Sequence, residues 1–206
     1  FPTNSVCYII FMPMSSTSEI PEEIKRLRLC SALRDCGKLG VEQGFKQSVK
    51  KELFVYDDQS KKHTDWSEAA PKEKSKCFIV SNPDGVTLIL LPLDGCIITG
   101  TSVTKGGVAD CALLAKKELC LVEFKTNTDS KNLQTIEQRI REGESQLWHT
   151  FSEIIAPRCE KVSVFIDKIV DVSFFVVFDS ALEVTSFSAA KMEMMTAFLE
   201  KHHYRL

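Results

Sequence analysis

The sequence predicts an α/β domain built on a mixed β-sheet with helices on its faces. Short apolar segments joined by tight turns fill the middle of the chain, and strands joined in this way pair as antiparallel neighbours. A long amphipathic helical pattern then separates the last of these segments from another strand pattern, at residues 172–178. A helix that connects two neighbouring strands of one sheet makes them parallel, so we expect an antiparallel meander followed by a parallel strand.

Composition and charge narrow the class of protein. The chain has 206 residues, 44% of them hydrophobic, which suits a single globular domain spanning residues 1–206. No apolar run approaches the roughly 20 residues of a membrane-spanning helix, so we expect no membrane partner. The net charge of -2 gives no overall basic field for nucleic acid, which leaves only local lysine clusters for that purpose.

The eight cysteines indicate a reducing compartment. None forms a CxxC pair, and several (Cys77, Cys96, Cys111 and Cys120) lie in apolar segments, where cysteine acts as a small buried hydrophobe. We therefore expect a cytoplasmic or other reducing intracellular location, with neither a disulfide framework nor a zinc site. The opening FPTNSVCYIIFMPM lacks the basic flank of a signal peptide. Because the first residue is not Met, we expect the chain to be a piece of a longer protein.

The N-terminal third mixes helix and strand patterns. The expected elements are a strand at residues 5–11, a helix at 18–37, a weaker helix at 38–51, a strand at 52–58 and a polar, lysine-rich loop at 57–76. Ser18 can cap the first helix, and Glu22 and Glu23 follow where the helix dipole favours acidic side chains. The weaker helix is predicted from apolar residues spaced four apart, such as Val41 and Phe45.

The middle of the chain reads as consecutive strands. They are expected at residues 77–80, 86–93, 96–100, 108–115 and 119–124. Turn sequences separate them, among them Asp84-Gly85 and Asp94-Gly95, and Asp-Gly between apolar runs is a strong hairpin signal. A further turn at 116–118 makes the last two strands a hairpin.

The C-terminal third begins with the long amphipathic helix. A polar cluster at residues 127–130 marks its start, and apolar residues then recur with a helical period. We expect Gly143 to interrupt this helix and Pro157 to end it. The remaining expectations are strands at 161–166 and 172–178 and a final helix that begins at Ser186 or Ser188 and carries Met192, Met195 and Leu199. We expect these two methionines to lie in the core.

One of the expected strands ends unusually, in Glu123-Phe124-Lys125. Two other acidic-x-Lys triplets occur, at 23–25 in a helix pattern and at 129–131 at a helix start, so the triplet alone is what chance provides. Only Glu123 terminates a buried strand. In the expected hairpin, a residue near 111 lies opposite Glu123, which places Asp110 and Glu123 at the same end of the sheet.

Two neighbouring carboxylates at a sheet end suit a divalent cation. They repel each other and do not both ionise without compensation. Mg²⁺ provides it, because it binds through one or two carboxylates and keeps several waters. Asp110, Glu123 and the backbone carbonyl of Phe124 are the candidate ligands. Lys125 points to the same face as Glu123, where it could orient or help to deprotonate a water that attacks a phosphodiester.

Asp110 followed by Glu123-Phe124-Lys125, within this order of helices and strands, resembles the PD-(D/E)xK nuclease superfamily. That family includes restriction endonucleases, RecB-like nucleases and Holliday-junction resolvases. The resemblance covers about residues 38–170 and implies a restriction-endonuclease-like core, with an N-terminal helix and a C-terminal strand and helix added to it. It also implies that Asp110 and Glu123 bind Mg²⁺, or Mn²⁺ as a substitute, and that Lys125 is the catalytic lysine. Ala109 stands where the family pattern has a proline that is often absent.

Family members often add two further residues to the site. One is an acidic residue on the first core helix, for which Glu42 is a better candidate than Glu52. The other is a glutamine on the helix that follows the motif. Gln134, Gln138 and Gln146 all lie there, and nothing in the sequence selects among them.

Three functions remain open at this point. The first is a Mg²⁺-dependent nuclease that acts on DNA rather than RNA, with phosphate affinity supplied by a local basic groove, a homodimer, a partner subunit or a missing domain. The second is an inactive nuclease-like module for nucleic-acid binding or protein assembly. The third is an unrelated α/β interaction domain in which Lys125 forms a surface ion pair with Glu123, worth less than about 1 kcal/mol. No P-loop, GxSxG elbow or Cys/His pair favours another enzyme class.

Overall fold

A five-stranded mixed sheet lies at the centre of the computed structural model, which describes residues 20–128, 132–182 and 187–204 and leaves aside the side chains of residues 101 and 187–194. Its strands, in spatial order, are β1 (Lys46–Ser48), β5 (Leu88–Pro92), β6 (Cys111–Ala115), β7 (Glu118–Phe124) and β8 (Asp171–Val177). All neighbours are antiparallel except β7 and β8, which are parallel. The predicted fold class, an α/β domain with a mixed sheet flanked by helices, is confirmed.

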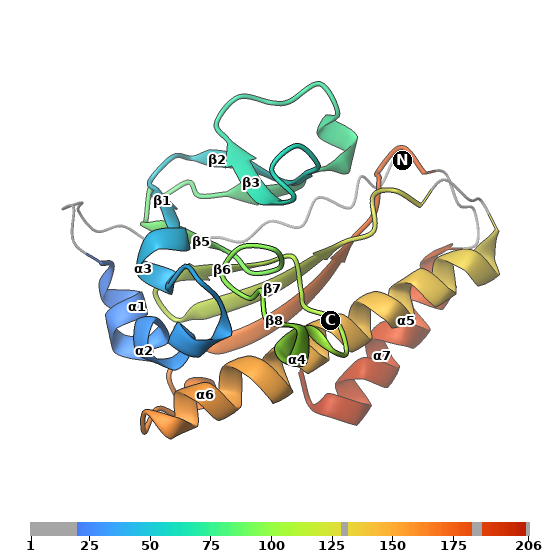
Figure 1. Ribbon diagram of the computed structural model, residues 1–206. Coiled ribbons are helices and arrows are strands. Elements are labelled where there is room, and N and C mark those ends of the chain that lie inside the picture. Colours follow the sequence, from blue (N-terminus) through green and yellow to red (C-terminus); the bar gives the residue numbers. More distant parts are fainter. Residues whose placement is uncertain (1–19, 129–131, 183–186, 205–206) are drawn as a thin grey trace.

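A second, three-stranded antiparallel sheet covers one face of the central sheet (Figure 1). Its strands, in spatial order, are β3 (His63–Ser67), β2 (Glu52–Asp58) and β4 (Phe78–Ser81). Apolar side chains of the two sheets form a shared core. The prediction of a loop throughout residues 57–76 is wrong, because His63–Ser67 pairs along β2. The polar sequence of β3 concealed it, since a strand at the edge of a sheet needs little apolar alternation.

Helices cover the opposite face of the central sheet (Figure 1). They are α1 (Glu22–Leu27), α2 (Leu29–Ala32), α3 (Val41–Gly44), α5 (Leu133–His149), α6 (Ala156–Lys161) and α7 (Phe187–His202), with the single turn α4 (Thr101–Thr104) beside them. Shorter turns are η1 (Arg34–Cys36), η2 (Lys74–Lys76), η4 (Ile166–Lys168) and a π-helical turn, η3 (Thr150–Ile155). The result is three layers, with the central sheet in the middle and buried on both faces.

Side chains of the central strands alternate between the two cores. In β7, Leu119 and Leu121 face the helices, whereas Cys120 and Val122 face the second sheet. Burial on both faces explains why β5, β6 and β7 are nearly continuous apolar runs rather than alternating ones.

The long helix α5 runs through Gly143 without a break. A Cβ atom at Gly143 would lie 2.9 Å from a methyl of Val176 and 3.6 Å from Cγ of Glu123, so the glycine lets α5 approach β7 and β8 closely. The predicted interruption is therefore wrong. Pro157 does not end the helix either, because the chain continues from the π-helical turn Thr150–Ile155 into α6, which holds Pro157 in its first turn.

Several other predicted elements differ from the structure. The weak helix at 38–51 is one turn, α3, followed by β1. Residues 96–100 form no strand beyond a single bridge between Asp94 and Ile98, and 161–166 contains the end of α6 and the start of η4. Ile97, Ile98, Val164 and Ile166 in these segments are apolar because they pack in the helical core.

The final helix, α7, is confirmed, but not the side it buries. Met195 and Leu199 are exposed, whereas Phe198 is buried. Ser188 lies inside the helix, and Ser186, Ser18, the side chain of Met192 and the predicted strand at 5–11 lie outside the described residues. Of the helices in the described part of the chain, none has the length and apolarity needed to cross a bilayer. The seven cysteines described are free thiols.

Candidate active site

The β6–β7 hairpin brings Asp110 and Glu123 together. Cys111 pairs with Val122, so Asp110, the next residue outward, lies opposite Glu123, one position from the predicted register. Alternation along both strands directs the two carboxylates to the helical side of the sheet. The Asp110 carboxylate accepts a hydrogen bond of 2.6 Å from the backbone N–H of Phe124. Asp110 and Glu123 therefore meet at one sheet end and on one face.

Glu123 is almost fully buried, with 3% of its surface exposed. Its Oε1 accepts a hydrogen bond of 2.9 Å from Nζ of Lys125. Its Oε2 is buried and has no hydrogen-bond partner among the described residues. A buried carboxylate oxygen without a partner is unfavourable, and such an atom calls for a ligand.

Lys125 connects the strand end to α5. Its Nζ donates to Glu123 and also, at 2.6 Å, to Oε1 of Gln146. An ammonium group has three donors, so these contacts use two of them. The structure thus selects Gln146 from the three glutamines on this helix. Gln134 donates its backbone N–H to the Asn132 side chain at the helix start, and Gln138 contacts Glu142 on an exposed surface.

The electrostatics of the pair call for a positive charge. Burial, reinforced by the negative charge of Glu123, raises the pKa of Asp110 from 3.8 to about 8. Burial also raises the pKa of Glu123 from 4.5 to about 7, although the Lys125 ammonium opposes the rise. The two carboxyls titrate as a unit, and near neutral pH one of them must hold a proton unless a cation takes its place.

Two further carboxylates, which the sequence did not point to, add to the negative charge. Asp57 is the last residue but one of β2, Asp94 lies two residues after β5, and both raise the pKa of Asp110. Asp94 also raises the pKa of Glu123. Their one signal in the sequence is that each lies close to a strand end, as Glu123 does. The pairing of β5 with β6 brings Asp94 near Asp110, whereas the packing of the second sheet on the central one brings Asp57 there.

Two of the acidic residues considered from the sequence lie elsewhere. Glu42 is on α3, 4.0 Å from the Arg34 guanidinium. Glu52 is exposed at the start of β2, opposite Ser81. Neither is among the charges that shift the pKa of Asp110 or Glu123.

The donor set at the strand end fits Mg²⁺. Among the described residues, no group of three or more His, Cys, Asp or Glu side chains is placed to hold a metal ion. Mg²⁺ does not require one, because it binds through one or two carboxylates and keeps several waters. Asp110, the unpartnered Oε2 of Glu123 and the carbonyl of Phe124 are the oxygens at hand.

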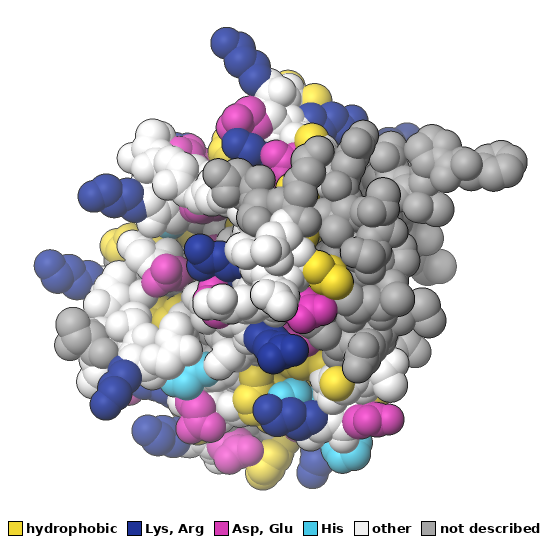
Figure 2. Space-filling view, turned by 90° about the vertical axis from the view of Figure 1, so that its right-hand side faces the viewer, with side chains coloured by type: hydrophobic (Ala, Val, Ile, Leu, Met, Phe, Trp, Pro, Cys, Tyr) yellow, Lys and Arg dark blue, Asp and Glu magenta, His cyan; other side chains and the backbone are white. Residues whose placement is uncertain are grey.

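The charges on the surrounding surface are mixed. Figure 2 views the molecule from the right-hand side of Figure 1, toward which the chain leaves β7. On this face Lys and Arg side chains project separately with Asp and Glu among them, and the described side chains form no continuous basic patch.

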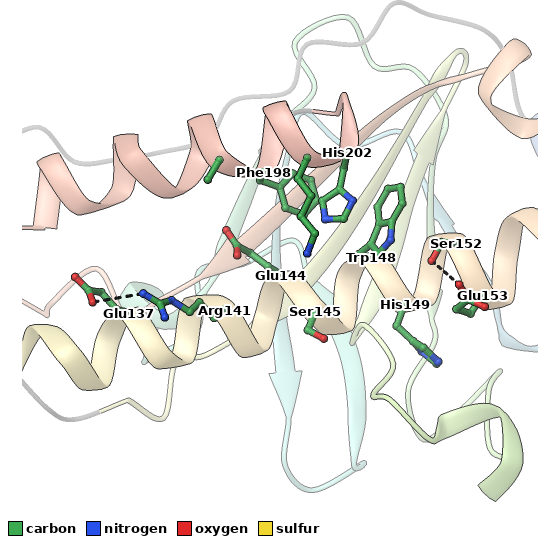
Figure 3. Close-up of a pocket in the computed structure, with 12 residues that line it drawn as sticks. Glu137, Arg141, Glu144, Ser145, Trp148, His149, Ser152, Glu153, Phe198 and His202 are labelled. Carbon is green, nitrogen blue, oxygen red and sulfur yellow. Dashed lines mark hydrogen bonds and ion pairs between the residues drawn. The ribbon is translucent and has the colours of Figure 1, made fainter.

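A separate groove of about 840 Å³ lies between α5 and α7 (Figure 3). Charges of both signs line it, including Arg141, Glu144 and Lys201, and the rings of Trp148 and His202 stack with centroids 3.9 Å apart. None of Asp110, Glu123 and Lys125 lines this groove. Its mixed lining matches no single class of ligand.

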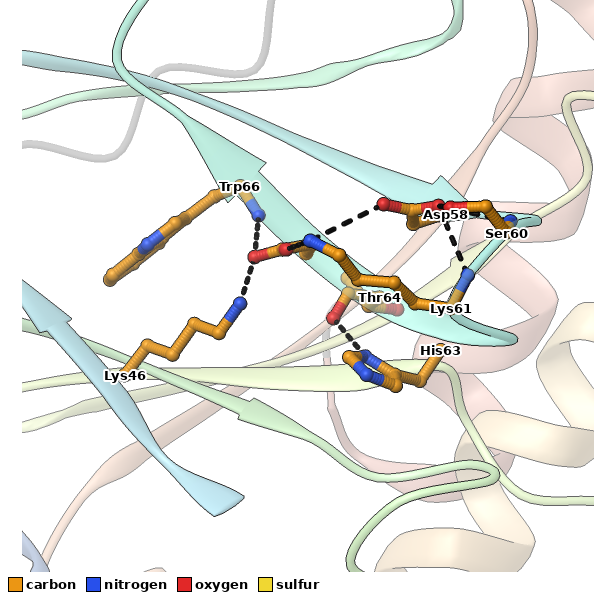
Figure 4. A network of polar contacts seen from close by, with 8 residues as sticks. Lys46, Asp58, Ser60, Lys61, His63, Thr64 and Trp66 are labelled. Atoms are coloured by element: carbon orange, nitrogen blue, oxygen red, sulfur yellow. Dashed lines mark hydrogen bonds and ion pairs between the residues drawn. The ribbon is translucent and has the colours of Figure 1, made fainter. Parts of the chain in front are cut away.

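A second buried carboxylate, Asp65 on β3, joins the two sheets (Figure 4). It contacts Nζ of Lys46 on β1 and Nζ of Lys61, and accepts a hydrogen bond of 2.7 Å from the Trp66 N–H. Burial opposes ionisation, but hydrogen bonds from the two lysines outweigh it and lower the pKa of Asp65. Asp65 is fully compensated by protein groups, which is the arrangement expected of a structural carboxylate.

Comparison of the chain with protein-family models, with curated proteins and with solved structures found no match. A function must therefore be inferred from the geometry and chemistry of the site itself.

Proposed function

We propose that this chain is a metal-dependent nuclease of the PD-(D/E)xK type that hydrolyses phosphodiester bonds in DNA. One observation carries the proposal. Asp110 lies opposite Glu123 at a sheet end, and Lys125 lies on the same face, 2.9 Å from Glu123. These are the three side chains that the motif requires, and the fold places them together although Asp110 is 13 positions before Glu123 in the sequence.

The topology supports the same proposal. The antiparallel strands β5, β6 and β7, the crossing helix α5 and the parallel strand β8 follow the order expected for a restriction-endonuclease-like core. The elements that follow this order extend to residue 177, slightly past the range of the sequence resemblance. The sheet of β2, β3 and β4 is an addition to it.

Each residue of the site has a defined role in this proposal. Asp110, Glu123 and the Phe124 carbonyl would hold Mg²⁺, which when bound acts as a Lewis acid on the phosphoryl group and makes water more acidic. Glu123 and Gln146 fix the Lys125 ammonium in place. Its remaining N–H can donate to the attacking water or to the phosphoryl oxygens, where negative charge increases in the transition state.

The acidic surroundings make substrate binding depend on cations. Asp57, Asp94, Asp110 and Glu123 lie near one strand end, and a phosphodiester would be repelled from it while they remain uncompensated. With a net charge of -2, the chain would also rely on a homodimer or a partner subunit for much of its phosphate affinity.

Cleavage assays test the proposal directly. Plasmid DNA, single-stranded DNA and RNA are incubated with the protein at pH 8 in Mg²⁺, in Mn²⁺ and in EDTA. We expect cation-dependent cleavage of DNA, and we expect Lys125→Met to reduce kcat by about 10²-fold to 10³-fold because transition-state charge stabilisation is lost. Lys50→Met, which removes an exposed lysine paired with Glu68, is the matched control and should cleave normally.

Two outcomes would contradict the proposal. The first is the absence of cation-dependent cleavage of both nucleic acids by the wild-type protein. The second is cleavage by Lys125→Met at the wild-type rate. Cleavage of RNA alone would replace DNA as the substrate and leave the site assignment standing.

A further inference from the structure

The loop that precedes Asp110 depends on α5 for its shape. Gly106 and Gly107 adopt φ values of +117° and +88°, which other residues rarely adopt. A Cβ atom on Gly106 would lie 2.7 Å from the His149 ring, and one on Gly107 would lie 2.5 Å from Cγ of Gln146. The backbone of this loop therefore lies directly against one turn of α5.

Two hydrogen bonds fasten the loop to that turn. The Nδ1 atom of His149 lies 2.7 Å from the carbonyl oxygen of Gly107, and the N–H of Ala109 donates to Oγ1 of Thr150 at 2.7 Å. Ala109 immediately precedes Asp110, so the second bond fixes the backbone beside the carboxylate.

Thr150 is fully buried and lies where α5 changes into the π-turn Thr150–Ile155. Its hydroxyl donates to the backbone carbonyl of Gln146 at 2.7 Å, which leaves its lone pairs to accept from Ala109. π-turns are rare and often occur at functional sites. The side chain of Gln146 in turn holds Lys125. The helical turn from Gln146 to Thr150 thus contacts both the loop before Asp110 and Lys125 after Glu123.

We propose that Thr150 is a positioning residue whose hydroxyl keeps Asp110 opposite Glu123 and in register with the Gln146–Lys125 pair. Without this hydroxyl the buried N–H of Ala109 loses its partner, and the loop shifts to satisfy it. The Asp110 carboxylate then moves away from the Phe124 N–H. The effect on catalysis rests on the proposed nuclease function, whereas the effect on the position of Asp110 does not.

Hydrogen exchange measured by NMR reports that position directly. The Phe124 amide donates to Asp110, and the Leu121 amide in the middle of β7 serves as the reference. In Thr150→Val, which removes the hydroxyl at nearly constant volume, we expect Phe124 to exchange about tenfold faster relative to Leu121. Thr150→Ser keeps the hydroxyl and should match the wild type. Ser152→Ala removes a half-buried hydroxyl on the same π-turn that contacts Glu153, and this variant should also match the wild type.

Kinetics provide the second measurement. In Thr150→Val we expect kcat to fall by on the order of 10²-fold with KM nearly unchanged, because misplacement of a catalytic group affects mainly the chemical step. Thr150→Ser should restore the rate. If Thr150→Val does not fold, His149→Ala provides a second variant. It removes the hydrogen bond to Gly107 and the ring that packs against Gly106 but keeps the bond from Ala109 to Thr150, so we expect exchange and kcat to change in the same direction and by less.

Equal normalised exchange at Phe124 in the wild type and in the variant would overturn the proposal, and so would a Thr150→Ser variant as defective as Thr150→Val. A wild-type protein that cleaves no nucleic acid would contradict the nuclease function instead. In that case the exchange measurement still decides whether Thr150 positions Asp110.

Discussion

Replacing Asp110 with asparagine should make the metal-free protein more stable and should abolish the proposed nuclease activity. The folded pKa values of Asp110 and Glu123, about 8 and about 7, lie above their ordinary values of 3.8 and 4.5. The native state therefore holds more protons than the unfolded chain in this interval, and its stability falls as the pH rises from about 4 to about 8. Asparagine carries no charge and retains an oxygen that can accept the hydrogen bond from Phe124.

The magnitude follows from the pKa of Asp110. A rise from 3.8 to about 8 corresponds to about 6 kcal/mol at about 1.4 kcal/mol for each pKa unit. One proton relieves the repulsion for both carboxyls, and the asparagine amide must itself be desolvated. We therefore expect Asp110→Asn to gain about half of this free energy of unfolding at pH 8. A gain of about 3 kcal/mol raises Tm by roughly 6–12 °C in a protein of this size.

Urea and thermal unfolding of wild type and Asp110→Asn in EDTA, at pH 5 and pH 8, measure this gain. It should stay below about 1 kcal/mol at pH 5 and reach about 3 kcal/mol at pH 8. Adding Mg²⁺ at pH 8 should stabilise the wild type and not the variant, because the cation replaces the missing proton. A variant that is less stable than the wild type at pH 8 without metal would refute the reasoning, since the charge of Asp110 would then stabilise the fold.

Two other substitutions test the surrounding structure. Asp65→Asn should lower the free energy of unfolding by about 1–3 kcal/mol at pH 7. Because the folded pKa of Asp65 lies below its ordinary value of 3.8, this loss should disappear as the pH falls below 3.8. Urea titrations at pH 7 and below pH 3.8 measure the difference. Gly143→Ala should destabilise the protein by about 1–3 kcal/mol, because the new methyl group would overlap Val176. Helix propensity alone would stabilise the protein by about 1 kcal/mol. The sign of the change in the urea midpoint therefore shows which of the two effects is larger.

The sequence predicts the hairpin of the site well and its surroundings poorly, for physical reasons. Continuous apolar runs and the turn at Lys116 locate β6 and β7 because these signals are local. The register was one residue off because the turn contains two residues, between Ala115 and Glu118.

Contacts between distant segments account for most of what the sequence did not predict. Asp57 approaches Asp110 only through the packing of two sheets, and Asp94 approaches it through the pairing of β5 with β6. Gln146 could not be chosen over the other glutamines because the rotation of α5 depends on how Gly143 fits against Val176. Residues 96–100 resembled a strand because apolar residues also pack beneath helices.

The contrast between Asp65 and Asp110 separates the three functions considered for this chain. Asp65 is satisfied by two lysines and a backbone N–H, and its pKa is lowered. Asp110 receives one backbone N–H, faces another carboxylate, and has a raised pKa, while Oε2 of Glu123 has no partner. Whole domains are stable by only about 5–15 kcal/mol, so a penalty of about 3 kcal/mol is substantial for a protein with no use for the pair. An interaction domain or an inactive module would gain stability from a neutral residue at either position. The cation-dependent nuclease that we propose requires both carboxylates, and this requirement would account for their unfavourable environment.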